Sequence, residues 1–208
     1  MTANTKAAAM PVGENAGASG KADSADWHDE LTELQQRRQW ADGLGGAEAV
    51  ARHHDNGRLT VRERIAALTD ADSFQEVGKL AGQGHYQDGR VTHVTPAPYV
   101  MGLASIGGRP VAIGGEDYTI RGGSSWSGDR KKGGQGGFVE ELALKYRIPL
   151  VNLIDGVGGS VTSAKRRGHT VFPGVHGFET SVALMSVAPV VSVVLGTAAG
   201  GPAGRAML

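Results

Sequence analysis

The sequence contains no cysteine, no excess of either charge and only short apolar runs. Without cysteine it can form no disulfide, thiolate metal site or cysteine nucleophile, which fits a reducing compartment. Its 21 basic and 21 acidic side chains cancel, so no overall field attracts nucleic acid or an anionic membrane. No apolar run approaches the roughly 20 residues of a membrane span, and the N-terminus lacks a secretion signal's apolar core. We therefore expect a cytoplasmic protein with neither nucleic acid nor membrane as partner.

Glycine is abundant instead. The 208 residues include 33 glycines, mostly in pairs and without a collagen period. Together with apolar runs long enough for buried strands and helices, this composition predicts many tight turns that lie close to a ligand or to neighbouring backbone. The chain divides by composition into an expected disordered tail over 1–25, a helical segment over 26–70 and a mixed domain over 71–208.

Helical patterns dominate residues 26–70. One helix is predicted from Trp27 to the glycines after residue 42, and a second spans 47–54. A third begins with a capping box formed by Thr60 and Glu63. The first helix should carry one apolar face, made of Trp27, Leu31, Leu34 and Trp40.

Strand-like segments begin near Phe74, and Gly107-Gly108 joins two apolar runs as a hairpin turn would. The later elements are predicted as a helix over 138–147, a strand over 148–154, a helix over 177–187 and a strand over 190–195. Alternation of strand, helix and strand indicates an α/β protein whose parallel strands are joined by crossover helices.

Both of these late strands run into glycine-rich turns. Ile154 precedes "DGVGG" and Leu195 precedes "GTAAGG". The strands read as buried, and ligands of open α/β sheets bind at the carboxyl ends of the strands. We therefore expect the two turns on one rim of the sheet.

The first turn fits neither nucleotide pattern. The phosphate-loop pattern requires Gly-Lys-Ser/Thr where the chain has Ala164-Lys165-Arg166, and the third glycine of the dinucleotide pattern would fall at Val161. Backbone N–H groups from two turns can instead form an oxyanion hole, which stabilises a developing thioester enolate by about 3 to 4 kcal/mol per donor. The alternative is that the glycines only permit tight turns. The candidate catalytic donors are Gly158, Gly159, Gly200 and Gly201.

No side-chain catalytic group is evident. Ser124 and Ser160 follow glycine pairs, but neither lies in Gly-x-Ser-x-Gly. Glu116-Asp117 are neighbours on a strand, so their side chains should point to opposite faces and not share acid–base work. The seven histidines lack metal-ligand spacing, and His53-His54 on a helix and His85 and His93 in turn-rich sequence read as solvated or structural. We expect no metal.

Two basic clusters flank the candidate turns. Either could pair with the phosphates of an acyl carrier such as coenzyme A, and either could be an ordinary solvated edge. The clusters are Arg130-Lys131-Lys132 and Lys165-Arg166-Arg167.

Four stretches together resemble the carboxyltransferase (beta) subunits of biotin-dependent acyl-CoA carboxylases of the propionyl-CoA and acetyl-CoA type. The stretches are "GRLTVRERIAALTDADSF", "GGRPVAIGGEDYTIRGGS", "IPLVNLIDGVGGS" and "PVVSVVLGTAAGG". They follow the family's order over about residues 46–208. The resemblance implies an α/β, crotonase-like (ClpP/crotonase) fold with a helical N-terminal segment, incomplete at residue 208, in which 71–208 is a truncated acyl-CoA carboxyltransferase N-terminal domain.

The resemblance also implies a reaction, carboxyl transfer from carboxybiotin to the α-carbon of an acyl-CoA. The implied substrate-binding residues are Gly122, Gly123, Ser124, Arg130, Lys131, Lys132 and Ala199. The implied partners are a biotin carboxylase or biotin carboxyl carrier subunit and further copies of the full-length subunit. The chain departs from the family pattern at Ser160-Val161, where Ala-Arg is usual.

Two alternatives stay open. A decarboxylase subunit would need the same enolate cradle, and a non-catalytic acyl-CoA-binding or scaffolding subunit would fit the departure at Ser160-Val161 and the lack of the family's second crotonase-like domain. We expect this segment alone to be inactive.

Overall fold

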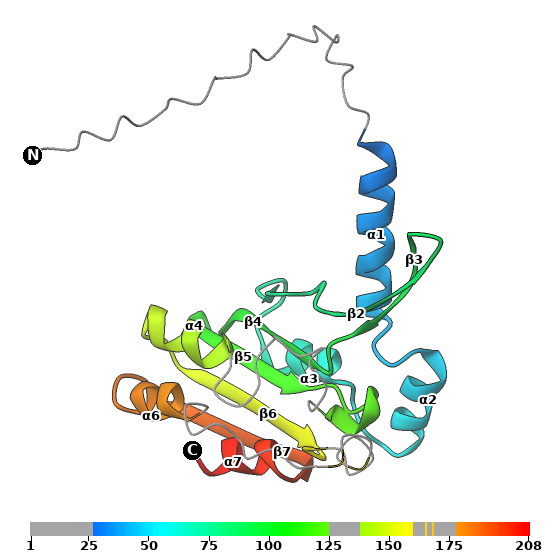
Figure 1. Cartoon of the computed structure of the whole chain (residues 1–208). Helices are drawn as coiled ribbons and strands as arrows, with labels where there is room; N and C mark the ends of the chain where they lie inside the picture. The colour runs from blue at the N-terminus through cyan, green and yellow to red at the C-terminus, as the bar shows by residue number, and fades with distance from the viewer. Residues whose placement is uncertain (1–26, 125–137, 160–164, 166–167, 169–177) are drawn as a thin grey trace, which may run out of the picture.

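The computed structural model describes residues 27–124, 138–159, 165, 168 and 178–208. Three helices come first, α1 (His28–Asp42), α2 (Ala47–Asp55) and α3 (Val61–Leu68). The strands that follow are β1 (Gln75–Glu76), β2 (Gly82–Gln87), β3 (Arg90–Pro96), β4 (Tyr99–Ile106) and β5 (Arg109–Glu116). The remaining elements are the 3-10 helix η1 (Arg121–Gly123), α4 (Phe138–Tyr146), β6 (Leu150–Gly156), α6 (Glu179–Met185), β7 (Val190–Ala198) and α7 (Gly201–Met207). Helices and strands mix as predicted (Figure 1).

The main sheet has the strand order β1-β4-β5-β6-β7. β1, β4 and β5 are antiparallel, whereas β5, β6 and β7 run parallel, so the predicted parallel strands are present. The predicted hairpin joins β4 to β5. Its turn residues Gly107 and Gly108 have φ of +58° and +75°, as a type I′ turn requires. The carboxylate of Asp70 accepts hydrogen bonds from both of their N–H groups, at 2.9 and 2.7 Å.

The core lies on both faces of this sheet. On one face Ile65 of α3 joins Val100, Ile113 and Leu153. On the other, Leu184 of α6 and two buried residues of α4 pack against Tyr99, Met101, Ala112 and Leu150. Neighbouring strand residues therefore face opposite sides, as the pleat dictates. α3 covers one face and α4 with α6 covers the other.

A second hairpin, β2–β3, was not predicted from the sequence. His85 and His93, expected in turns, are cross-strand partners whose rings stack 5.8 Å apart. The segment does carry local signals, because β3 (RVTHVTP) is rich in Val and Thr. Its two-residue turn is Asp88-Gly89, with φ of +50° and +77°, a sequence typical of type I′ hairpins. The hairpin lies against α1, where the rings of Trp40 and His93 are 5.7 Å apart (Figure 1).

The expected apolar face of α1 is not packed into the core. Ala41 is the buried residue of this helix, and Trp27 is 63% exposed. α1 projects away from the sheet (Figure 1). Its side lies against the β2–β3 hairpin, and its C-terminal end contacts α3, where Arg62 Nη2 donates to Ala41 O at 3.3 Å.

β7 also differs from expectation. It is the last strand of the sheet, and its Val191, Val194 and Leu195 are exposed. The apolar run was read as a buried strand, but within the described part of the chain β7 pairs with β6 alone. None of the helices described here has the length and apolar content needed to cross a membrane.

Candidate active site

The two predicted glycine turns lie side by side at the carboxyl ends of β6 and β7. The ladder pairs Gly156 with Ala198, and Ala199 N donates to Gly156 O at 3.1 Å. A Cβ on Gly158 would collide with the carbonyl oxygen of Ala199 and would lie 3.1 Å from Cα of Gly200. The backbones are therefore in contact, and no side chain fits between them.

Both turns need glycine for their backbone conformation as well. Gly158 has φ of +73° and Gly200 has φ of +63°, in the region that L side chains rarely adopt. Gly201 then begins α7, whose first N–H groups have no partner within the helix.

Residues 122–124, implied as substrate-binding, adjoin the first turn. Val157 N donates to Gly122 O at 2.9 Å. A Cβ on Gly123 would lie 3.0 Å from the carbonyl oxygen of Asp155. Ser124 is buried beside them. Five further candidates lie outside the described residues, namely Arg130, Lys131, Lys132, Arg166 and Arg167, whereas Lys165 is described and exposed.

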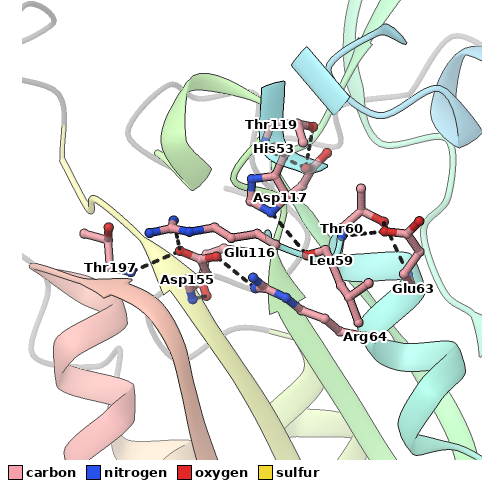
Figure 2. A network of polar contacts seen from close by, with 11 residues as sticks. His53, Leu59, Thr60, Glu63, Arg64, Glu116, Asp117, Thr119, Asp155 and Thr197 are labelled. Atoms are coloured by element: carbon pink, nitrogen blue, oxygen red, sulfur yellow. Dashed lines mark hydrogen bonds and ion pairs between the residues drawn. The ribbon is translucent and has the colours of Figure 1, made fainter. Parts of the chain in front are cut away.

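Sequence reasoning missed a network of buried charges behind these turns. The Asp155 side chain is 0% exposed and lies between two arginines. Arg64 of α3 approaches Asp155 Oδ2 with its Nη1 at 2.9 Å, and Arg58 Nη1 is 3.8 Å from Oδ1. Thr197 N of β7 donates to Oδ1 at 3.0 Å. Figure 2 shows Asp155 where β6 meets Arg64 and Thr197.

A second buried carboxylate extends the network. Glu116 ends β5 and forms an ion pair with Arg205 of α7, and both side chains are buried. Asp155 N donates to Glu116 Oε2 at 3.2 Å. On its other side, the Arg205 guanidinium lies 5.4 Å from the ring centre of Tyr99. Because a buried carboxylate is stable only when its charge is compensated, the two arginines bind α3 and α7 to the ends of β5 and β6.

Glu116 and Asp117 have separate partners. Asp117 Oδ1 accepts from Thr119 N at 3.0 Å and from Thr119 Oγ1 at 2.6 Å. Burial raises the pKa of Asp117 above its ordinary value. The structure therefore agrees with the expectation that these neighbours do not work as an acid–base pair.

The helical segment meets the same end of the sheet through α2 and α3. His53 is buried with Nε2 3.1 Å from Leu59 O, and His54 Nε2 lies 2.9 Å from Glu63 Oε2, so both have structural contacts. The predicted capping box is present, with Thr60 N donating to Glu63 Oε2 at 2.7 Å (Figure 2).

A cleft of about 380 Å³ opens between α2 and η1 beside this segment. Its lining residues are Ala49, Arg52, His53, Asn56, Tyr118, Thr119, Arg121 and Gly122. The guanidinium of Arg58 lies over the Tyr118 ring, 5.5 Å from its centre. Among the described residues, no group of three histidines or carboxylates is arranged to hold a metal.

The carboxyl transferase domain family matches residues 52–205 of this sequence. The chain belongs to this family. It is 34% identical over 175 residues to the biotin-dependent acetyl-/propionyl-coenzyme A carboxylase beta5 subunit of Mycobacterium tuberculosis, an alignment that covers 82% of this chain and 30% of that protein. It is 31% identical over 178 residues to the methylmalonyl-CoA carboxyltransferase 12S subunit of Propionibacterium freudenreichii, covering 82% and 32%. The chain thus spans about a third of the length of these curated relatives.

Solved structures agree on the fold. A single-chain, multi-domain long-chain acyl-CoA carboxylase is similar with a TM-score of 0.63 and 28% identity, over 85% of this chain and 18% of that one. Transcarboxylase 12S, with methylmalonyl-coenzyme A bound, is similar with a TM-score of 0.59 and 23% identity, over 85% and 33%. The expected family and the crotonase-like α/β fold with its helical N-terminal segment are confirmed.

Proposed function

We propose that this chain is the acyl-CoA-binding part of a carboxyltransferase that moves a carboxyl group from carboxybiotin to the α-carbon of an acyl-CoA. Its family membership and its likeness to acetyl- and propionyl-CoA carboxylase beta subunits support this proposal. The chain spans about a third of these relatives, so the proposed activity is that of the whole protein.

The contact between the two glycine turns is the observation that carries the proposal. Removing the α-proton of a thioester places negative charge on the carbonyl oxygen, and N–H donors fixed beforehand stabilise that charge without reorganisation. In this proposal Gly158 and Gly159 supply donors from one turn, and Gly200 and Gly201 supply them from the other. Because the charge develops only in the transition state, such donors raise kcat.

The two buried carboxylates at this end of the sheet have a structural role and not a catalytic one in this proposal. Glu116 and Asp155 are paired with arginines and buried, so neither is placed to take the α-proton. The chain's own contribution is to bind the thioester, orient its α-carbon and stabilise the enolate oxygen.

Biotin, carried by a partner, would supply the activated carboxyl group. The two buried carboxylates behind the turns are already paired with arginines, so they present no uncompensated negative charge to a neutral ureido ring at this end of the sheet. A biotin carboxylase or biotin carboxyl carrier subunit is therefore the proposed partner. Oligomers of the whole subunit are also proposed, in line with the hexamer assembly described for transcarboxylase 12S.

The test is a carboxylation assay of the full-length protein. A carboxylated biotin carrier and either acetyl-CoA or propionyl-CoA would be mixed with it, and malonyl-CoA or methylmalonyl-CoA formation would be followed. We expect product that depends on both substrates. Release of carbon dioxide from a malonyl-type thioester without the forward reaction would favour the decarboxylase, and binding of acyl-CoA without turnover would favour the scaffold.

A further inference from the structure

We propose that Asp155 is a positioning residue whose buried carboxylate holds the two glycine turns in register, and that Arg64 of α3 holds this carboxylate in place. The inference rests on the proposed function, because it concerns the turns assigned to the thioester oxygen. It gives the helical N-terminal segment a role in the site.

The first step is a change of register opposite Asp155. Ile154 pairs with Val194, whereas Gly156 pairs with Ala198. Residues 195–197 of β7 therefore stand opposite Asp155 alone. A bulge of this kind leaves backbone groups outside the ladder, and Asp155 Oδ1 accepts one of them, Thr197 N, at 3.0 Å.

The bulge decides which residues of the two turns meet. Without it, the pairing of Ile154 with Val194 would continue to place Gly158 opposite Ala198. With the two extra residues in β7, Gly158 reaches Gly200 instead, and a Cβ on Gly200 would lie 3.4 Å from Cα of Gly158. The side chain that stabilises the bulge therefore also sets the alignment of the turns.

The β7 backbone fits closely around the carboxylate. A Cβ on Gly196 would collide with the carboxylate of Asp155. The orientation of the carboxylate is also fixed, because Arg64 Nη1 lies 2.9 Å from Oδ2 and Arg58 Nη1 lies on the side of Oδ1. Since Asp155 is 0% exposed, it does not touch a substrate and acts through the turns.

Hydrogen exchange tests the positioning role directly in the full-length protein. Asp155→Asn keeps an oxygen for Thr197 N but loses the attraction of the arginines. We expect amide exchange to quicken about tenfold in both glycine turns together, residues 156–159 and 198–201. Arg64→Met should quicken exchange in the same peptides, and Arg64→Lys, which keeps the charge, should do so less.

Kinetics give the second readout. Because the turns act on charge that develops in the transition state, Asp155→Asn should lower kcat by about 10- to 100-fold and change KM for propionyl-CoA by less than about twofold. Arg64→Lys should recover part of the loss that Arg64→Met causes. If Asp155→Asn does not fold, the two Arg64 variants supply the same comparison.

Glu76→Gln is the matched control. It breaks another ion pair of α3, between Arg62 Nη1 and Glu76 Oε2 at 2.8 Å, at the β1 edge of the sheet. Equal quickening of exchange in the turns of this control, or unchanged exchange in the Asp155 and Arg64 variants, would overturn the positioning role. Faster exchange in those variants with unchanged kcat would support the positioning role and overturn the assignment of the thioester oxygen to the turns.

Discussion

Several glycines of the rim leave room for neighbouring groups as well as for a ligand. A Cβ on Gly156 would lie 2.8 Å from Glu116 Cγ, and one on Gly123 would lie 2.9 Å from Glu116 Cβ. Gly196 likewise leaves room for the Asp155 carboxylate, with which a Cβ at this position would collide. The glycine pattern therefore indicated the right end of the sheet, but it could not separate turns that face a substrate from glycines that accommodate buried acids.

Gly158→Ala tests the two roles given to Gly158, a turn conformation with positive φ and a backbone N–H aimed at the thioester oxygen. The substitution combines an unfavourable φ of +73° with a collision against Ala199 O. We expect the unfolding free energy to fall by about 2 kcal/mol or more, and kcat of the full-length protein to fall more than KM changes. Gly89→Ala is the control, since Gly89 has φ of +77° with no atom near its Cβ position. It should lose about 1 kcal/mol and leave kcat unchanged, and equal kcat losses would contradict the assignment.

The lysines at 131 and 132 lie outside the described residues, so their role remains a prediction. If they pair with coenzyme A phosphates, Lys131→Ala with Lys132→Ala removes contacts made equally in ground and transition states. KM for acyl-CoA should then rise about tenfold or more, while kcat barely changes. Measurement at low ionic strength keeps screening from hiding the effect. An unchanged KM would show that the cluster does not bind coenzyme A and is an ordinary solvated edge.

Elements with local signals were predictable. The capping box of α3 and the Gly107-Gly108 turn depend on residues three or fewer positions apart, and both are present. The β2–β3 hairpin carries a signal of the same kind, the Asp88-Gly89 turn before the Val- and Thr-rich β3, but it was not recognised in the sequence. The predicted apolar face of α1 is not packed in the core, because periodicity shows which side of a helix is apolar and not what covers it.

The α3 capping box predicts a response to acid. The hydrogen bond from His54, followed by those from Thr60, lowers the pKa of Glu63 from 4.5 to about 2. A carboxyl group with a lowered folded pKa contributes stability above its unfolded pKa and loses it as pH falls toward the folded one. The contribution should therefore disappear between about pH 4.5 and 2. Glu63→Gln should flatten the dependence of the unfolding free energy on pH in this window, measured by urea unfolding.

Thr60 gives the matching test of the cap itself. Thr60→Ala removes the acceptor of Glu63 N and should lower the unfolding free energy by about 1 kcal/mol. Thr60→Ser keeps the hydroxyl and should lose much less. Equal losses in the two variants would show that the Thr60 methyl group, not the cap, stabilises this helix.

At the scale of the whole molecule, the buried network was beyond sequence reasoning. Arg64, Asp155 and Arg205 lie on three elements that are far apart in the sequence, and each alone reads as an ordinary charged residue. The sequence did predict that the turns after β6 and β7 share a rim, because parallel strands end on one side. What it could not predict was the bulge that aligns them, which depends on the Asp155 side chain in its buried position.

The apolar surface at the β7 edge predicts assembly. Large exposed side chains gather on α6, β7 and α7, namely Val182, Met185, Val191, Val194, Leu195 and Met207. Surfaces of this kind are rarely left uncovered. Sedimentation of the full-length protein at micromolar concentration should therefore show an oligomer, whereas a clean monomer would contradict this expectation. Val194→Asp in the isolated chain should reduce its self-association.

The arginines of the network also constrain the order in which the chain can fold. Asp155 receives its cation from α3 and Glu116 receives one from α7, two helices that are far apart in the sequence. Desolvating either carboxylate before its arginine arrives is strongly unfavourable. During synthesis α3 is made before β6, so Arg64 is present when Asp155 is buried. Glu116 at the end of β5, by contrast, cannot form its ion pair with Arg205 until α7 has left the ribosome. The glycine turns should therefore be among the last parts of the chain to become ordered.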